Sequence, residues 1–247
     1  MNPGLDVEKT IDQWNAEFTG KRRQPLRDLS QYSTEGLEWL MMEHFQFSFR
    51  NCAFLWDSAE ATGKFDREAV KAELVRNFKE ESGHAAMYKA ALKRVGSDVE
   101  ARTEFKPTTE FLDSLGDLCK NQDPSFVLGL MFATETAAIF EHQVFRDVSV
   151  EVIARRGAGD SGKALVAFHD LHLDGVEQSH KDELGIFLRG LQADQSEVPA
   201  EGNRPTIQPG RALAGGRAGI DLMDNWWGHL FETLGEKRAQ AATAAAV

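Results

Sequence analysis

Apolar residues recur along the chain at intervals of three and four, the spacing that places side chains on one face of an α-helix. In the segment that follows Ser33, Leu37, Leu40 and Met41 begin one such stripe. We find no run of alternating apolar and polar residues, the pattern typical of a β-strand. The sequence therefore predicts an all-α bundle of about seven helices, at residues 5–19, 33–62, 67–94, 108–119, 124–156, 163–191 and 212–234.

Turn-forming residues separate these helices. Gly20 and Gly96 follow two predicted helix ends, Asp66 is placed to cap the helix that begins at 67, and Pro124 occupies a first turn. Residues 192–210 contain three prolines and are expected to form a long loop. We expect one domain over residues 1–247, with a core at 33–234 and a disordered tail at 235–247.

The charge, apolar content and cysteines of the chain exclude some classes of function. A formal net charge of −11 argues against a nucleic-acid partner, because phosphate binding requires a basic surface. The short basic cluster at 21–23 is expected to be solvated. Neither a signal peptide nor an apolar run of the ~18 residues that a membrane span needs is present. Cys52 and Cys119 are expected to be reduced core residues. We predict a cytoplasmic protein with a small-molecule partner, and leave a homodimer open.

Glu81 and His84 form the first candidate site. Residues three apart lie on one helical face, so both side chains can reach one point. Phe78, Ala85 and Tyr88 share roughly that face, which places the pair beside the apolar stripe. A surface acid next to a core histidine is the more common explanation of an isolated pair of this kind. Similar residues on two later helices favour a functional interpretation.

Two further helices carry acids and imidazoles in apolar surroundings. Glu135 lies on a helix that is apolar all round near Phe126–Ala133, where an unpaired charge would be costly. The helix over 163–191 carries His172, Glu177 and His180, and Glu177 and His180 repeat the Glu-x-x-His spacing. Helical bundles build two-metal sites from such pairs, and iron and manganese accept these donors. Three carboxylates and three imidazoles are enough for two divalent ions.

At these residues the chain resembles the heme-oxygenase-like non-heme diiron oxidases and oxygenases, fold relatives of the thiaminase-II (TenA) and pyrroloquinoline-quinone-synthase proteins. The matching segments are 77–81, 133–135 and 172–180, within a similarity that covers about Glu35 to Leu234. The resemblance implies two Fe(II) ions and dioxygen as co-substrate. It also implies a ligand set of Glu81, His84, Glu135, His172, Glu177 and His180.

His172 precedes Glu177 by five residues, a separation that does not place both side chains on one face of a regular helix. On a regular helix His172 and Glu177 point about 140° apart, too far for one ion. A single-turn π-bulge near Asp174–Gly175 would bring the two side chains together, and such bulges favour functional sites. If no bulge forms, another side chain has to complete the site, and the candidates are His169, Asp170 and Asp174.

The resemblance implies N-oxygenation, desaturation or oxidative C–C cleavage of a small amino acid or carboxylate in specialised metabolism. A substrate carboxylate would require a cationic partner, for which Arg50 and Arg217 are the candidates. Two other functions stay open. One is a metal-free enzyme resembling the TenA and quinone-synthase branch, in which acids and histidines transfer protons. The other is a non-catalytic helical protein with structural histidines.

Overall fold

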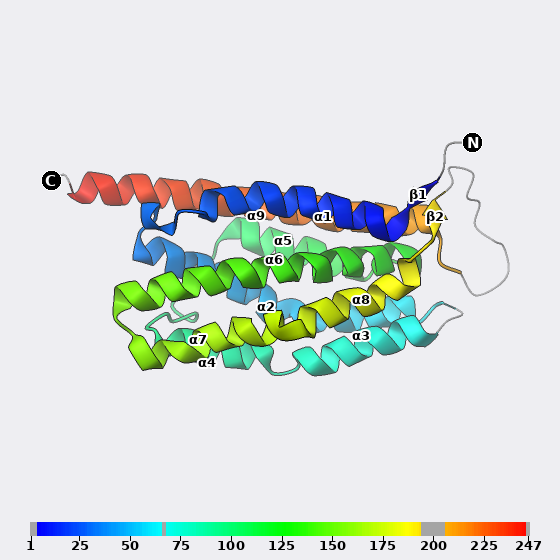
Figure 1. The fold of residues 1–247 in the computed structure, drawn as a ribbon, viewed down its shortest axis with the longest axis horizontal. Helices are drawn as coiled ribbons and strands as arrows, with labels where there is room; N and C mark the ends of the chain where they lie inside the picture. Colours follow the sequence, from blue (N-terminus) through cyan, green and yellow to red (C-terminus); the bar gives the residue numbers. More distant parts are fainter. Residues whose placement is uncertain (1–3, 66–67, 194–205, 246–247) are drawn as a thin grey trace.

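The computed structural model describes residues 4–65, 68–193 and 206–245, with side chains as far as residue 236. Within these ranges the chain forms nine α-helices, three short helical turns and one pair of two-residue strands (Figure 1). The α-helices are α1 (Val7–Arg23), α2 (Thr34–Thr62), α3 (Glu68–Glu81), α4 (His84–Arg94), α5 (Lys106–Cys119), α6 (Pro124–Arg156), α7 (Gly159–Leu171), α8 (Glu177–Leu188) and α9 (Pro209–Ala245). The all-α prediction is confirmed.

The nine helices correspond to the seven predicted ones because two of these are broken. The helix predicted over 67–94 is divided into α3 and α4 at Gly83, whose φ of 102° is left-handed. The helix predicted over 163–191 starts earlier, at Gly159, and is interrupted by a π-helical segment, η3 (His172–Val176). Both breaks lie beside candidate ligands.

Several predicted helix ends shift. α1 continues past Gly20 to Arg23, and Asp6 caps its start by accepting a hydrogen bond from the backbone N–H of Lys9 at 3.0 Å. α9 extends to Ala245, so the expected disordered tail is helical as far as the structure describes it. The alanine-rich sequence of that segment has a high intrinsic helix propensity. The proposed cap Asp66 and residues 194–205 of the predicted loop lie outside the described residues.

α6 is the central helix of the bundle. It packs against α2, α7, α8 and α9 and is buried along most of its length. α6 and α9 approach so closely that a Cβ atom at Gly129 would overlap the carbonyl oxygen of Ala212, and one at Gly215 would overlap that of Phe126. Glycine at these two positions lets the backbones meet.

The remaining helices lie on two sides of α6 (Figure 1). α1 and α9 run side by side along one edge of the bundle, and α3, α4, α7 and α8 lie toward the opposite edge (Figure 1). The strands β1 (Leu5–Asp6) and β2 (Gln192–Ala193) pair antiparallel beside the start of α1. Cys52 and Cys119 are free thiols, but only Cys119 is buried in the core, whereas Cys52 is partly exposed. None of the described helices is both long and apolar enough to cross a membrane.

Candidate metal centre

The six predicted ligands lie close together between α3, α4, α6 and the interrupted helix formed by α7, η3 and α8. Five of them are buried, and the sixth, His84, is partly buried. They are Glu81, His84, Glu135, His172, Glu177 and His180. Segments that are far apart in the sequence thus bring acids and imidazoles together inside the bundle.

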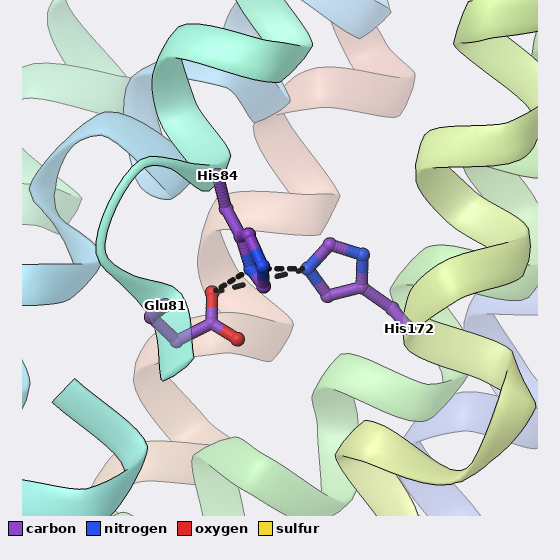
Figure 2. Close-up of side chains that lie close together, drawn as sticks. All are labelled: Glu81, His84 and His172. Atoms are coloured by element: carbon purple, nitrogen blue, oxygen red, sulfur yellow. Dashed lines mark hydrogen bonds and ion pairs between the residues drawn. The ribbon is translucent and has the colours of Figure 1, made fainter. Parts of the chain in front are cut away.

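Glu81 and His84 face each other across the α3–α4 break. The Nδ1 atom of His84 lies 3.0 Å from Oε2 of Glu81, and Nε2 of His172 lies 3.1 Å from that same Nδ1. Figure 2 shows the three side chains pointing toward one another, with His172 reaching across from the neighbouring rod. The predicted pair is therefore close in space, although it is not on one continuous helix. Ser82 and Gly83 form the turn between its members.

Of the two alternatives considered for His172, the structure contains the π-bulge. Residues His172–Val176 form a π-helical turn in which Asp174 and Gly175 leave helical geometry, and Gly175 has a φ of 113°. Widening the helix here brings Nε2 of His172 to 4.0 Å from Oε1 of Glu177. A left-handed residue at this turn favours glycine, which has no Cβ to clash.

His180 is oriented by a hydrogen bond to an acid outside the predicted set. Its Nε2 atom lies 2.9 Å from Oε2 of Glu80, which accepts the N–H. The other ring nitrogen, Nδ1, lies 3.4 Å from Oε2 of Glu135 and 3.8 Å from Oε2 of Glu177. Histidines that bind metals usually donate their second N–H to a carboxylate or carbonyl in this way.

His172 is also oriented by a hydrogen bond from one ring nitrogen, in this case to a backbone carbonyl. Its Nδ1 donates to the carbonyl oxygen of Phe168 at 2.7 Å, because a carbonyl can only accept. This fixes the tautomer and leaves Nε2 without a proton, facing Glu81 at 3.8 Å and Glu177 at 4.0 Å. Both His172 and His180 thus present one nitrogen to the carboxylates.

The charged form of Glu177 is disfavoured in this cluster. Burial raises the pKa of Glu177 well above its ordinary value, and the charges of Glu135 and Glu81 raise it further. Burial also acts to raise the pKa of Glu81, but the neighbouring imidazoles of His172 and His84 outweigh this and lower it to about 2. A divalent cation among these groups would offset their mutual repulsion.

A cavity of about 30 Å³ adjoins this cluster. Its polar lining includes four of the six candidate ligands and polar side chains of α2, and Phe47 and Ala138 form the apolar part of its wall. The polar side chains are His44, Ser48, Asn51, Glu81, Thr134, Glu135, Glu141, His142, His172 and Glu177. The cavity has room for molecules of the size of water or dioxygen.

Sequence reasoning missed two side chains at this cluster, His142 and Glu80. The Nε2 atom of His142 lies 3.5 Å from Oε1 of Glu177, and its ring stacks on His172 with centroids 3.9 Å apart. A signal was present, because His142 follows Glu135 by seven residues, which is two helical turns on one face. Glu80 gave no comparable signal, since it precedes Glu81 and a regular helix would point the two apart.

The two arginines proposed to bind substrate do not lie at the cluster. Arg50 pairs with Asp113 at 3.2 Å, and Arg217 pairs with Asp221 at 2.9 Å. Both arginine side chains are about half exposed, and neither residue lines the cavity. Helical periodicity places a residue on a face but does not show which acid it will meet there.

The three substitutes considered for His172 are not needed. His169 is buried, with its Nδ1 3.1 Å from Nδ1 of His142. Asp170 pairs with Arg146, and Asp174 is exposed to solvent. The π-helical turn removes the geometric reason for replacing His172.

The donor atoms fit divalent metal ions. Among the described residues three groups each offer three ligand atoms within 4.8 Å of one another. The groups are Glu81, His84 and His172, then His142, His172 and Glu177, and finally Glu81, Glu177 and His180. Oε1 of Glu81 and Nδ1 of His180 are buried without a hydrogen-bond partner. Such atoms are costly unless a cation or donor meets them.

Solved structures identify the fold. A CADD-like protein of unknown function from Nostoc punctiforme has a TM-score of 0.71 at 21% identity, over 92% of this chain and 96% of that one. A domain of unknown function with a heme oxygenase-like fold from Shewanella denitrificans has a TM-score of 0.60 at 15% identity, over 92% and 89%. This chain has the heme-oxygenase-like fold.

A TenA homologue from Pseudomonas syringae pv. tomato shares the heme-oxygenase-like architecture as well, with a TM-score of 0.65 at 13% identity, over 92% of this chain and 91% of that one. No protein-family model matches the sequence, and no curated protein matches it. The resemblance to the heme-oxygenase-like group and its TenA relatives is confirmed at the level of the fold.

Proposed function

We propose that this protein is a non-heme diiron oxidoreductase that uses dioxygen. The proposal rests on one observation, the overlap of the three donor groups. Glu81, His172 and Glu177 each belong to two of them, so ions held by neighbouring groups would share ligands. Carboxylate and imidazole donors inside a helical bundle are the setting in which proteins hold paired iron ions.

Two Fe(II) ions held here would supply the electrons and the open coordination positions needed to activate dioxygen. The chain's own residues have separate tasks. Glu80 and the carbonyl of Phe168 orient His180 and His172 through the hydrogen bonds described above. Burial of the cluster limits the access of bulk water, which strengthens electrostatic contacts and protects reactive species.

The proposed substrate is a small amino acid or carboxylate, which would undergo N-oxygenation, desaturation or oxidative C–C cleavage. Ser48, Asn51 and Thr134 line the cavity and could hydrogen-bond a polar substrate. A cavity of about 30 Å³ is smaller than an amino acid, so substrate binding requires lining side chains to move. The cationic partner that a substrate carboxylate would need is not among the residues lining the cavity.

Two observations favour this proposal over a metal-free enzyme. No cysteine is among the described residues that line the cavity, so a thiol nucleophile is missing there. Glu135, the partner whose absence would favour proton-transfer chemistry alone, does line it. A non-catalytic protein would have no use for several buried acids facing one another, because such groups destabilise the fold unless a cation compensates them.

An anaerobic titration with ferrous ion tests the proposal. We expect about two equivalents to bind, and Glu135→Ala and His84→Ala each to lose one. His229→Ala is the matched control, because His229 is 44% exposed and pairs only with Glu232 in the described structure. Failure of the wild-type protein to bind iron, with Glu135→Ala equally or more stable, would favour the non-catalytic alternative.

Exposure of the iron-loaded protein to oxygen tests the chemistry. We expect a transient visible absorbance whose decay a substrate accelerates. A panel of amino acids and small carboxylates would be compared with their esters and amides, which lack the charged carboxylate. If no member of the panel changes the decay rate, the proposed substrate class is wrong, although the metal site itself would stand.

A further inference from the structure

The candidate donors are unevenly distributed. Around Nε2 of His172 lie Nδ1 of His84 at 3.1 Å and carboxylate oxygens of Glu81 and Glu177 at 3.8 and 4.0 Å. Carboxylate oxygens of Glu135 and Glu177 lie 3.4 and 3.8 Å from Nδ1 of His180. One end of the cluster is therefore rich in imidazole, and the other is rich in carboxylate.

His142 lies at the imidazole-rich end. Its donor atom groups with those of His172 and Glu177 within 4.8 Å, the same spacing that groups the predicted ligands. The ring is 8% exposed and stacks on His172 at an interplanar angle of 9°, so its orientation is fixed by packing. Nε2 lies 3.5 Å from Oε1 of Glu177, which is long for a hydrogen bond between these groups.

The second nitrogen of His142 has the contact expected of a ligand. Nδ1 lies 3.1 Å from Nδ1 of the buried His169. When Nδ1–H of His142 donates to His169, Nε2 of His142 carries no proton and faces Glu177 with its lone pair. In His172 and His180, likewise, one ring nitrogen donates a hydrogen bond and the other faces the carboxylates of the cluster. The acceptor is a backbone carbonyl for His172 and a carboxylate for His180.

We propose that His142 is a seventh metal-binding residue and that it makes the two ion positions unequal. The imidazole-rich end holds His84, His142 and His172 in two overlapping donor groups that share His172. The other end holds the imidazole of His180 with the carboxylate of Glu135. This inference rests on the proposed function, because it assigns a further residue to the same centre. It predicts stepwise loading, with the imidazole-rich position filled first by borderline metals such as Fe(II), Co(II) and Zn(II).

Other histidines of the core do not share this role. Nδ1 of His44 faces the hydroxyl of Tyr88 at 3.3 Å, and its Nε2 lies 3.9 Å from Glu141, which already accepts from Trp227 at 2.9 Å. Burial and the charge of His172 lower the pKa of His44 to about 3, so it is a neutral side chain of the core.

Anaerobic Co(II) titration, followed by its visible bands and by calorimetry, tests the inference. We expect two binding steps in the wild-type protein. His142→Ala should weaken the tighter step by about tenfold or more and leave the weaker step in place. Glu135→Ala should weaken only the second step. The costs of His84→Ala and His142→Ala should not be additive in the double variant, because the two residues belong to donor groups that share His172.

A second measurement needs no variant, and so does not depend on His142→Ala folding. Long-range ¹H–¹⁵N spectra of the Zn(II)-loaded wild-type protein count the metal-bound imidazoles among the seven histidines. Four bound rings support the inference. Three bound rings, or a His142→Ala protein with unchanged binding steps, overturn it while the metal site stands. Absence of binding by the wild-type protein would overturn the proposed function as well.

Discussion

His180 donates the N–H of Nε2 to Glu80 at 2.9 Å, and this hydrogen bond turns Nδ1 toward Glu135 and Glu177. Glu80 also accepts from Arg76 at 2.7 Å, so the carboxylate is itself held in place. A residue adjacent to a candidate ligand in the sequence thus positions a different ligand, one hundred residues away in the chain.

Glu80→Gln should lower metal affinity without removing a ligand. The amide is a weaker acceptor than a carboxylate, so the His180 ring becomes less basic and less firmly oriented. Losses of about 10–100-fold are typical for such outer partners. Competition with a coloured chelator measures the affinity. Glu73→Gln is the control, because Glu73 binds Arg76 on the same helix but does not contact His180. Equal effects of the two variants would contradict the positioning role.

Gly175→Ala should weaken metal binding as well as the fold. Alanine at a φ of 113° is strained, and relief of that strain would move His172 away from Glu177. Gly190→Ala serves as the control, because Gly190 has a φ of 74° and open space around it, away from the cluster. Both variants should melt at lower temperature. Only Gly175→Ala should lose metal affinity, which a titration with Zn(II) would measure.

Metal binding should strengthen as pH rises. Burial lowers the pKa of His180, but Glu135, Glu177 and Glu80 outweigh this and raise it to about 10 in the metal-free protein. The ring is therefore protonated at neutral pH, and a metal must displace the proton at Nδ1. Zn(II) affinity should rise between pH about 6.5 and about 8.5, with proton release detected by calorimetry in buffers of different ionisation enthalpy.

The raised pKa of His180 also determines how the folding stability of the metal-free protein changes with pH. Because the folded protein holds the proton more tightly than the unfolded chain, this stabilisation is complete below the unfolded pKa, near 6.5. It is lost as pH rises toward the folded value of about 10. His180→Asn should flatten both trends. A Zn(II) affinity that is independent of pH would show that Nδ1 does not bind the metal.

Gly129→Ala should destabilise the bundle. A methyl group there overlaps the carbonyl oxygen of Ala212, so α6 and α9 would have to separate. Overpacking of this kind costs about 1–3 kcal/mol or more. Gly20→Ala is the matched control, because Gly20 lies within α1 with nothing near its missing Cβ. That variant should gain about 0.5–1 kcal/mol from helix propensity. Urea unfolding of the metal-free proteins measures both changes.

Much of the fold follows from local information. The three- and four-residue spacing of apolar residues predicted the helices, and the apolar run at Phe126–Ala133 indicated the central one. The five-residue offset of His172 from Glu177 indicated either a π-bulge or a substitute ligand, and the structure contains the π-helical turn. These features depend on residues that are close together in the sequence and lie on one helix, so they can be predicted without the tertiary structure.

What the sequence determined by itself is the inventory of helices, acids and imidazoles, because side-chain chemistry and helical period are local properties. The tertiary structure decided which of these side chains share a point in space. It directed Arg50 and Arg217 to exposed acids, brought His142 to Glu177, and set Glu80 behind His180. Such pairings arise when separate helices pack, and their distances depend on contacts between residues far apart in the chain.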